Sequence, residues 1–294
     1  MDTPGRSMKP FSPKKHPCRP PPFPGETSCQ HGRETAACGH ARLPTCLKED
    51  MKHFAPPVPA LGLPLRSWWF VPASLVLFAL TLAMGTLAKA YGSPGPDLAW
   101  DVGMIRDRTT MQTVLAMVIN NVLSPAGNVL ILFLICLVLL VPFRKPLTAL
   151  AFGSTAAIGW LSSEIGKVTV ARLRPPSAIT HALILETGHN SFPSGHTAFA
   201  ASLVWATVLV LDRTPRQRIA TAIIGALFVV AVAFSRLYLG VHYPTDVLGS
   251  LLISTAGILL WLPLWNRLIE PRLRQTPLIR KLTPLPRPRR TANN

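Results

Sequence analysis

The stretch "NSFPSGHTAFAASLVWATVLVL" runs from Asn190 to Leu211 and joins two kinds of sequence. Its first part contains Pro193-Ser194-Gly195-His196 and has the composition of a polar turn, whereas the remainder is almost entirely apolar. A membrane span needs about 20 mostly apolar residues, and this run comes close to that length. The stretch therefore indicates a membrane protein and raises the question of why a serine and a histidine stand at the boundary of an apolar segment.

The whole chain is unusually apolar. Only 15% of its 294 residues are charged and its mean hydropathy is +0.32, whereas soluble domains carry about 25% charged residues. An unpaired backbone is too costly in hydrocarbon, so spanning segments are expected to be helices. We predict an all-α, polytopic membrane protein, a six-helix bundle within residues 67–270, with Pro125 and Asn128 leaving the start of the second span open. The apolar segments cover approximately 68–88, 122–143, 146–166, 196–212, 219–238 and 247–269.

The basic residues are distributed unevenly along this arrangement. With the N-terminus placed in the cytoplasm, 23 lysines and arginines fall on the cytoplasmic side and 7 on the other. Cytoplasmic loops of membrane proteins carry the excess of Lys and Arg. We therefore predict cytoplasmic termini in a bacterial inner membrane. The net charge of +17 is explained by this topology and by contact with anionic lipid, and no nucleic-acid-binding module accompanies it.

The two ends of the chain differ from the apolar middle. Residues 1–66 are rich in proline and lack apolar periodicity, which favours a disordered cytoplasmic tail. Met51 opens a second possible start, and residues 271–294 form a basic tail.

The cysteines of the N-terminal tail and their neighbouring histidines leave a zinc site open, although no pair has the usual short spacing. Ala88-Lys89-Ala90 resembles a signal-peptidase site, but the apolar run before it is longer than a usual signal core. The tail residues concerned are Cys18, Cys29, Cys38, Cys46, His16, His31 and His40.

Three polar clusters stand at the ends of the predicted spans, and the topology places all three on the non-cytoplasmic side. The first contains Lys167 and Arg174-Pro175, and the second is Pro193-Ser194-Gly195-His196. The third contains Ser235-Arg236, His242 and Asp246. Taken singly, each has an ordinary structural explanation: basic side chains anchor span ends, and a serine before a helix is usually an N-cap.

Taken together, the three clusters specify a chemistry. Lys167, Arg174 and Arg236 supply positive charge, and a helix start at Ser194–His196 supplies free N–H groups, a combination suited to a phosphate and its transition state. Two histidines and a carboxylate supply a nucleophile, its orienting group and a general acid. No carboxylate cluster for a metal ion lies on that side, so we predict a reaction without metal or other cofactor. The residues alone favour His242 as nucleophile, because Asp246 is its partner, but do not settle which histidine attacks.

The ordered pattern Lys-x6-Arg-Pro, Pro-Ser-Gly-His and Ser-Arg-x5-His-x3-Asp resembles the three-part signature of the type 2 phosphatidic acid phosphatase superfamily, over residues 68–269. The resemblance implies that His242 attacks phosphorus to form a phosphohistidine and that Asp246 orients it. It also implies that His196 protonates the leaving group. The same resemblance assigns the phosphate oxygens to Lys167, Arg174, Ser194, Gly195 and Arg236.

The expected function is that of a metal-independent lipid phosphatase whose substrate stays in the membrane while its headgroup meets the polar clusters. Undecaprenyl pyrophosphate, phosphatidylglycerophosphate and phosphatidic acid are the candidate substrates. The alternatives are a lipid phosphotransferase with the same triad and a non-catalytic lipid-phosphate binder or transporter. Substrate selection is expected in 93–121, read as an interfacial helix, and in 176–192. Arg172, which precedes the second segment, and His181 and His189 within it are candidates for contact with a second phosphate or a headgroup. The sequence does not indicate an oligomeric state.

Overall fold

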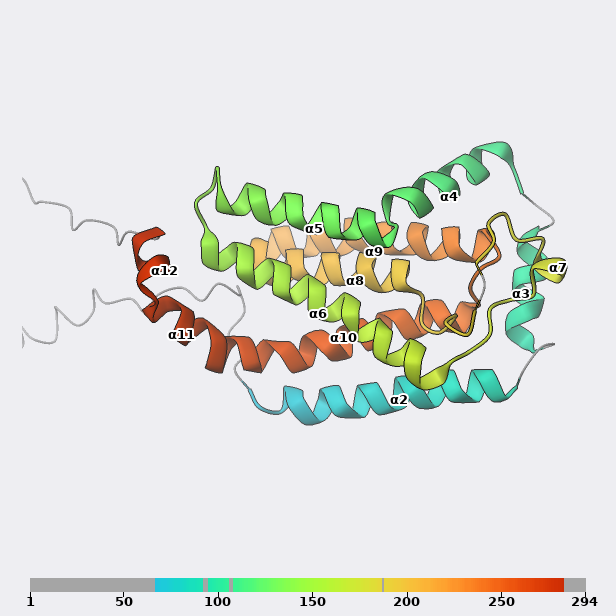
Figure 1. Ribbon diagram of the computed structural model, residues 1–294, viewed down its shortest axis with the longest axis horizontal. Helices are drawn as coiled ribbons and strands as arrows, with labels where there is room; N and C mark the ends of the chain where they lie inside the picture. Colours follow the sequence, from blue (N-terminus) through green and yellow to red (C-terminus); the bar gives the residue numbers. More distant parts are fainter. Residues whose placement is uncertain (1–66, 92–94, 106–107, 187, 283–294) are drawn as a thin grey trace, which may run out of the picture. The chain divides into compact units, whose positions relative to one another are not determined.

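The computed structural model describes residues 67–91, 95–105, 108–186 and 188–282, and within these ranges the chain forms helices joined by loops, without strands (Figure 1). The predicted all-α class is therefore confirmed for this part of the chain. The described residues all belong to one of the chain's two units, Ala55–Asn294. The proline-rich tail, its cysteines and histidines, and Met51 lie outside the described residues.

Each predicted apolar segment corresponds to a helix. These helices are α2 (Phe70–Ala90), α5 (Pro125–Leu140), α6 (Pro146–Val170), α8 (Gly195–Ala206) with its π-helical continuation η2 (Thr207–Leu211), α9 (Pro215–Tyr238) and α10 (Pro244–Leu264). The last continues through η3 (Trp265–Ile269) into α11 (Glu270–Gln275), and α12 (Pro277–Leu282) follows. The predicted boundary at residue 270 therefore falls inside a helical stretch.

The segment 93–121 forms two helices instead of the single interfacial helix that was expected. These are α3 (Pro96–Ile105) and α4 (Thr110–Val122), and the short α7 (Ser177–Thr180) lies in the other predicted selection segment. The Thr109 side chain accepts a hydrogen bond from the N–H of Gln112, which caps α4 and explains why a new helix begins there. The start of α5 at Pro125 resolves the boundary that the sequence left open, and α4 and α5 meet there at 67°.

Length and hydropathy support some of the predicted spans more strongly than others. Among the described residues, α2, α9 and the continuous helix Pro244–Gln275 could each cross a membrane, and the bent pair α4 and α5 could make a fourth span. The apolar helix Gly195–Leu211 is shorter. Since α6 has the length but not the apolarity of a span, the count of six stays a prediction.

The low apolarity of α6 follows from its position. It packs against α2, α5, α8 and α10, and its polar residues Thr155 and Ser163 are fully buried by these neighbours. Small residues allow α6 and α10 to approach each other closely. A Cβ added to Gly257 of α10 would lie only 2.0 Å from Ser162 Oγ of α6. Helix contacts in membranes are enriched in such small residues. Polar residues are tolerated on the side of α6 that these neighbours cover, whereas Leu161, Ile165 and Val168 remain exposed.

The same kind of contact fixes the loop before α8. The Phe192 ring is fully buried, and a Cβ added to Gly85 of α2 or Gly249 of α10 would lie within 2.5 Å of it. Pro193 lies as closely against Gly166 of α6. The loop therefore has anchors on three helices, which position the Ser194–His196 segment.

The loops that carry the three polar clusters meet at one end of the helix bundle (Figure 1). The end of α6 contributes the first cluster, the start of α8 the second, and the connection from α9 to α10 the third. Backbone contacts join them: the N–H of Ser194 donates to the carbonyl of Asp246, and the N–H of Ser191 donates to that of Arg172. The predicted convergence is thus present, while the side of the membrane on which it lies stays a prediction.

Candidate active site

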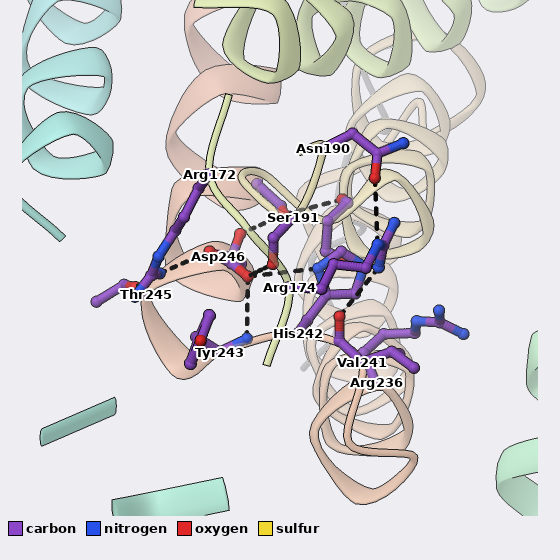
Figure 2. Close-up of polar contacts among 12 residues, drawn as sticks. Arg172, Arg174, Asn190, Ser191, Arg236, Val241, His242, Tyr243, Thr245 and Asp246 are labelled. Carbon is purple, nitrogen blue, oxygen red and sulfur yellow. Dashed lines mark hydrogen bonds and ion pairs between the residues drawn. The ribbon is translucent and has the colours of Figure 1, made fainter. Parts of the chain in front are cut away.

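His242 lies at the centre of the polar end of the bundle, between an arginine and a carboxylate (Figure 2). Its Nε2 is 3.2 Å from Nη1 of Arg174, and its Nδ1 is 3.5 Å from Oδ2 of Asp246. Because a guanidinium only donates, Nε2 must be the unprotonated nitrogen and Nδ1 carries the proton. Burial lowers the pKa of His242 to about 4, with Asp246 opposing the shift and Arg174 and Arg236 adding to it. The imidazole is therefore neutral near pH 7, with a lone pair on Nε2.

Asp246 is completely buried and is held from several directions. Its Oδ1 accepts a hydrogen bond from Arg172 Nη1 at 2.8 Å, and its Oδ2 accepts one from the N–H of Tyr243 at 2.9 Å. The Ser191 hydroxyl also donates to Oδ2. With these donors in place the carboxylate cannot turn away from His242, although the 3.5 Å separation from Nδ1 is longer than a hydrogen bond.

Arg172 extends this arrangement to α3. The guanidinium donates to Thr245 at 2.6 Å and to Asp97 Oδ2 at 2.9 Å, and it lies 3.9 Å from the centre of the Tyr243 ring. The sequence suggested that Arg172 contacts a second phosphate. The structure instead pairs it with two carboxylates, so its charge is already compensated.

Arg174 and Arg236 are joined by one carboxylate on the other side of His242. Glu186 Oε2 lies 2.7 Å from Arg174 Nη1, and Glu186 Oε1 lies 2.5 Å from Arg236 Nη2. Burial would raise the pKa of Glu186, but Arg236 and Arg174 outweigh it and hold that pKa below its ordinary value. An anion therefore already bridges the two guanidinium groups that were predicted to bind phosphate.

His196 stands in the first turn of α8 and faces α4. Its Nε2 is 3.3 Å from the Asn120 carbonyl oxygen, and the Asn120 side chain accepts a hydrogen bond from Arg236 Nη1 at 2.6 Å. Because a carbonyl oxygen only accepts, the contact requires Nε2 of His196 to carry a proton. The two histidines thus hold opposite tautomers: one presents a lone pair and the other an N–H group.

Ser194 occupies the N-cap position of α8, but its side chain does not cap the helix as expected. The hydroxyl instead accepts a hydrogen bond from Thr197 Oγ1 at 3.3 Å. Among the described residues, no acceptor is found for the N–H groups of Gly195 and His196, so they are available to an anion. Lys167 approaches closely, since a Cβ on Gly195 would lie 3.2 Å from its Nζ, and that Nζ pairs with Glu164 at 2.7 Å.

A cavity of about 300 Å³ lies where these groups meet. The predicted residues that line it are Lys167, Arg174, Gly195, His196 and His242. Of the other predicted residues, Asp246 lies behind His242, Arg236 reaches the cavity through Glu186 and Asn120, and Ser194 is buried at the helix start. The structure thus brings all eight predicted residues into or directly against one site.

Several residues in contact with this site were not singled out by the sequence, among them Glu186, Asn120, Ser191 and Asn190. Each lies in one of the two segments from which substrate selection was expected, but none has a spacing that marks it. Of the loop histidines, His189 lines a neighbouring cavity, whereas the exposed His181 lines neither.

Similarity to known proteins agrees with this site. Residues 147–270 match the PAP2 superfamily. Phosphatidylglycerophosphatase B of Escherichia coli (strain K12) is 46% identical over 79 residues, which cover 26% of this chain and 30% of that protein. The chain thus spans less than a third of this relative. Undecaprenyl-diphosphatase BcrC of Bacillus subtilis (strain 168) is 34% identical over 103 residues, covering 35% of this chain and 50% of that protein.

Two further comparisons extend over more of the chain. A crystal structure of a transmembrane PAP2-type phosphatidylglycerolphosphate phosphatase from Bacillus subtilis has a TM-score of 0.53 and 25% identity, covering 65% of this chain and 93% of that one. Phosphatidylglycerophosphatase B of Bacillus subtilis (strain 168) is 32% identical over 202 residues, which cover 65% of this chain and 92% of that protein. This apolar, helical chain is therefore an integral membrane protein and belongs to the PAP2 superfamily.

Proposed function

We propose that the protein is a lipid phosphatase that removes a phosphate group from a phosphate monoester or pyrophosphate of a membrane lipid. The observation that carries this proposal is the lone pair of His242 Nε2, held beside a cavity with two guanidinium groups in front and a buried carboxylate behind. Relatives named for phosphatidylglycerophosphate and undecaprenyl diphosphate support these two lipids as substrates, with phosphatidic acid as the third candidate.

The tautomers suggest the order of proton transfers. In the first step, Nε2 of His242 forms a bond to phosphorus while the bond from phosphorus to the lipid oxygen breaks. His196, which carries a second ring proton when the substrate phosphate is bound, gives its Nε2 proton to that oxygen and becomes neutral. In the second step, water attacks the phosphohistidine, His196 takes the proton of the water, and the phosphorus–nitrogen bond breaks. Asp246 stabilises the positive charge that the ring of His242 carries between the two steps.

The charged groups in front of His242 fit a phosphate. Arg174, Arg236 and Lys167, together with the free N–H groups of α8, are suited to bind oxygens that gain charge in the transition state. Glu186 bridges the two arginines, and in this proposal the substrate phosphate takes the place of its carboxylate. The site therefore exchanges one bridging anion for another, which avoids leaving the buried arginines unpaired.

Apolar side chains adjoin this charged group in the same cavity. Leu123 and Pro125 from the break between α4 and α5, and Trp160 from α6, line it together with His242 and Lys167. The lipid part of the substrate is proposed to lie there, with the phosphate at the histidines.

The excess of basic residues on the opposite side supports an active site on the non-cytoplasmic face of a bacterial inner membrane. Labelling of Ser177→Cys, but not Thr214→Cys, by an impermeant thiol reagent is the expected result, and the reverse pattern would exclude this orientation.

A phosphotransferase would use the same first step but another acceptor in place of water. A non-catalytic lipid-phosphate binder is less well supported, because a binder needs the cations but not the opposed tautomers of His242 and His196. The hydrolase is preferred over both, since the named relatives are phosphatases.

The test is a phosphate-release assay with purified protein on the three candidate lipids, in the presence of EDTA. Release from at least one lipid is expected, and vanadate, which mimics five-coordinate phosphorus, should inhibit it. His242→Asn serves as the inactive control. Activity that is lost with EDTA and restored by Mg²⁺ would contradict the metal-independent mechanism. Transfer of the phosphate to a second lipid, without its release, would identify the transferase.

A further inference from the structure

A second cavity, of about 340 Å³, lies next to the first and has no part in the mechanism above. Its walls come from the end of α2, the segment 171–176 after α6, and Tyr243. The C-terminal ends of α2 and α6 meet at this cavity, where Lys89 Nζ donates a hydrogen bond to the carbonyl oxygen of Val170 at 2.8 Å. Arg174 lines both cavities, and the consecutive residues His189 and Asn190 line one each.

The charges of the two cavities differ. Glu164 and Glu186 line the first, whereas the described residues that line the second include no acidic side chain. Within the second cavity, Arg172 is already paired with Asp97 and Asp246. Lys89 has no carboxylate within ion-pair distance among the described residues, since the partner of its Nζ is a neutral carbonyl. Among the residues that the structure describes, the positive charge of Lys89 in the second cavity therefore has no carboxylate counter-ion.

The surroundings of this cavity are apolar. Ala88, Leu173 and Pro176 line it beside Lys89. Along α2, Leu80 and Leu87 are 60% and 58% exposed, and the most apolar part of this helix is only 17% buried inside the protein. A ligand with a negative group at Lys89 and hydrocarbon against α2 would satisfy both features.

We propose that this cavity binds the phosphate headgroup of an anionic phospholipid that is not the substrate, with Lys89 and His189 as contacts and the acyl chains along α2. The site is separate from the proposed lipid phosphatase site, since the apolar wall of the first cavity comes from α4, α5 and α6. Arg174, which lies beside His242, lines both cavities, so an occupied lipid site would adjoin the catalytic histidine through this residue.

Binding of phosphatidylglycerol tests the proposal. This lipid is anionic but has no phosphate monoester, so binding is measured without turnover, and the proposed phosphatase activity is measured separately. Because phosphatidylglycerol is also the product of one candidate substrate, binding is measured with vanadate present to occupy the phosphate position of the first cavity. Its affinity for the full-length protein in detergent is measured by native mass spectrometry, with phosphatidylcholine as the zwitterionic comparison. Each basic contact near a membrane surface changes lipid affinity by about fivefold. Lys89→Gln is therefore expected to weaken phosphatidylglycerol binding by about that factor, His189→Asn is expected to weaken it less, and Lys89→Arg is expected to retain it.

Two matched variants locate the lipid. Lys167→Gln removes a lysine from the first cavity, and His181→Asn removes an exposed histidine from the same loop as His189. Neither is expected to change phosphatidylglycerol binding. Loss of binding with Lys167→Gln instead would place the lipid in the first cavity and overturn the proposal. Equal effects of Lys89→Gln and His181→Asn would also overturn it, as would an equal loss of phosphatidylcholine binding or equally tight binding of glycerophosphoglycerol, which lacks acyl chains.

Discussion

The two sides of His242 have opposite charge balances. In front of Nε2, the front layer contains Lys167, Arg174 and Arg236, with Glu164 and Glu186 as counter-ions. Behind Nδ1, the back layer contains Arg172 and three carboxylates, which belong to Asp97, Asp101 and Asp246. The front has an excess of positive charge beside a cavity, and the back has an excess of carboxylates in the protein interior.

In the proposed mechanism, this difference lets one imidazole attack a phosphate and then carry it. The front layer would attract the substrate and stabilise the charge on its oxygens. When Nε2 bonds to phosphorus, the ring becomes positive, and the carboxylate behind Nδ1 then stabilises it. If both layers had the same sign of charge, they would stabilise either the bound phosphate or the positive phosphohistidine ring, but not both.

The largest expected effect comes from separating the two histidines by the leaving group. A lipid alkoxide needs a proton to depart, whereas nitrophenolate leaves readily without one. We expect His196→Ala to lower kcat/KM on a lipid phosphate by about 10²–10⁴-fold and to affect nitrophenyl phosphate much less. His242→Ala, which removes the nucleophile, should affect both substrates alike. The measurement is kcat/KM of each variant relative to wild type on each substrate.

The outcome separates the assignments clearly. If His242→Ala, and not His196→Ala, retained activity on nitrophenyl phosphate, His242 would be the general acid and His196 the nucleophile. If neither variant is rescued, His196 serves mainly as a phosphate ligand and the acid lies elsewhere.

The back layer is tested through Arg172, which holds Asp246 without reaching the phosphate. Replacing residues that orient the ligands of a metal ion costs about 10–100-fold in affinity or activity, and we expect a similar range for a residue that orients the carboxylate behind a histidine. We expect Arg172→Gln to lower kcat by a factor in this range and to leave KM nearly unchanged, because Arg172 does not line the first cavity. Arg172→Lys keeps the charge and should recover part of kcat.

A second variant protects this test against simple misfolding. Thr245→Val removes a partner of Arg172 at 2.6 Å but leaves all charges in place, so it should fold and lower kcat less than Arg172→Gln. A rise in KM with unchanged kcat for Arg172→Gln would show that Arg172 acts on the substrate and not on Asp246.

The sequence predicted the helices well because apolar runs mark them directly. The first predicted span, 68–88, differs from Phe70–Ala90 by two residues at each end. The sequence was a poor guide to α3 and α4, because the Thr109–Gln112 cap was not recognised as a helix start. It also treated α6 like the other spans, since composition does not reveal that neighbouring helices cover Thr155 and Ser163.

In the site, too, the sequence revealed the residues that form a local pattern but not those that meet only in the folded chain. Lys167, Arg174, His196, His242 and Asp246 were found because their spacing forms an ordered pattern. Glu186 and Asn120 have no such spacing. Asn120 meets Arg236 across 116 positions of sequence, and only the folded chain reveals such a contact. The assigned chemical roles remain predictions that the variants above test.

The smallest expected effect concerns Asp101, the one back-layer carboxylate that does not pair with Arg172 through a hydrogen bond. It is 2% exposed, and neither oxygen has a hydrogen-bond partner among the described residues. Burial, followed by the charges of Asp246 and Asp97, raises its pKa from 3.8 to about 8. The folded protein therefore holds a proton that the unfolded chain releases above pH 3.8. The stabilising contribution of this neutral carboxyl is complete below that pH and is lost as the pH rises towards 8.

Asp101→Asn should consequently have little effect on the Tm at pH 5 and should raise it by a few degrees at pH 8. Thermal unfolding of the two proteins in the same detergent, from pH 5 to pH 8, measures the difference. Asp97→Asn is the matched control from the same helix face, and it should lower the Tm because it breaks the 2.9 Å pair with Arg172. A shift for Asp101→Asn that is the same at pH 5 and pH 8 would mean that Asp101 is ionised throughout. The back layer would then carry a third negative charge, and its contrast with the front layer would be greater than described above.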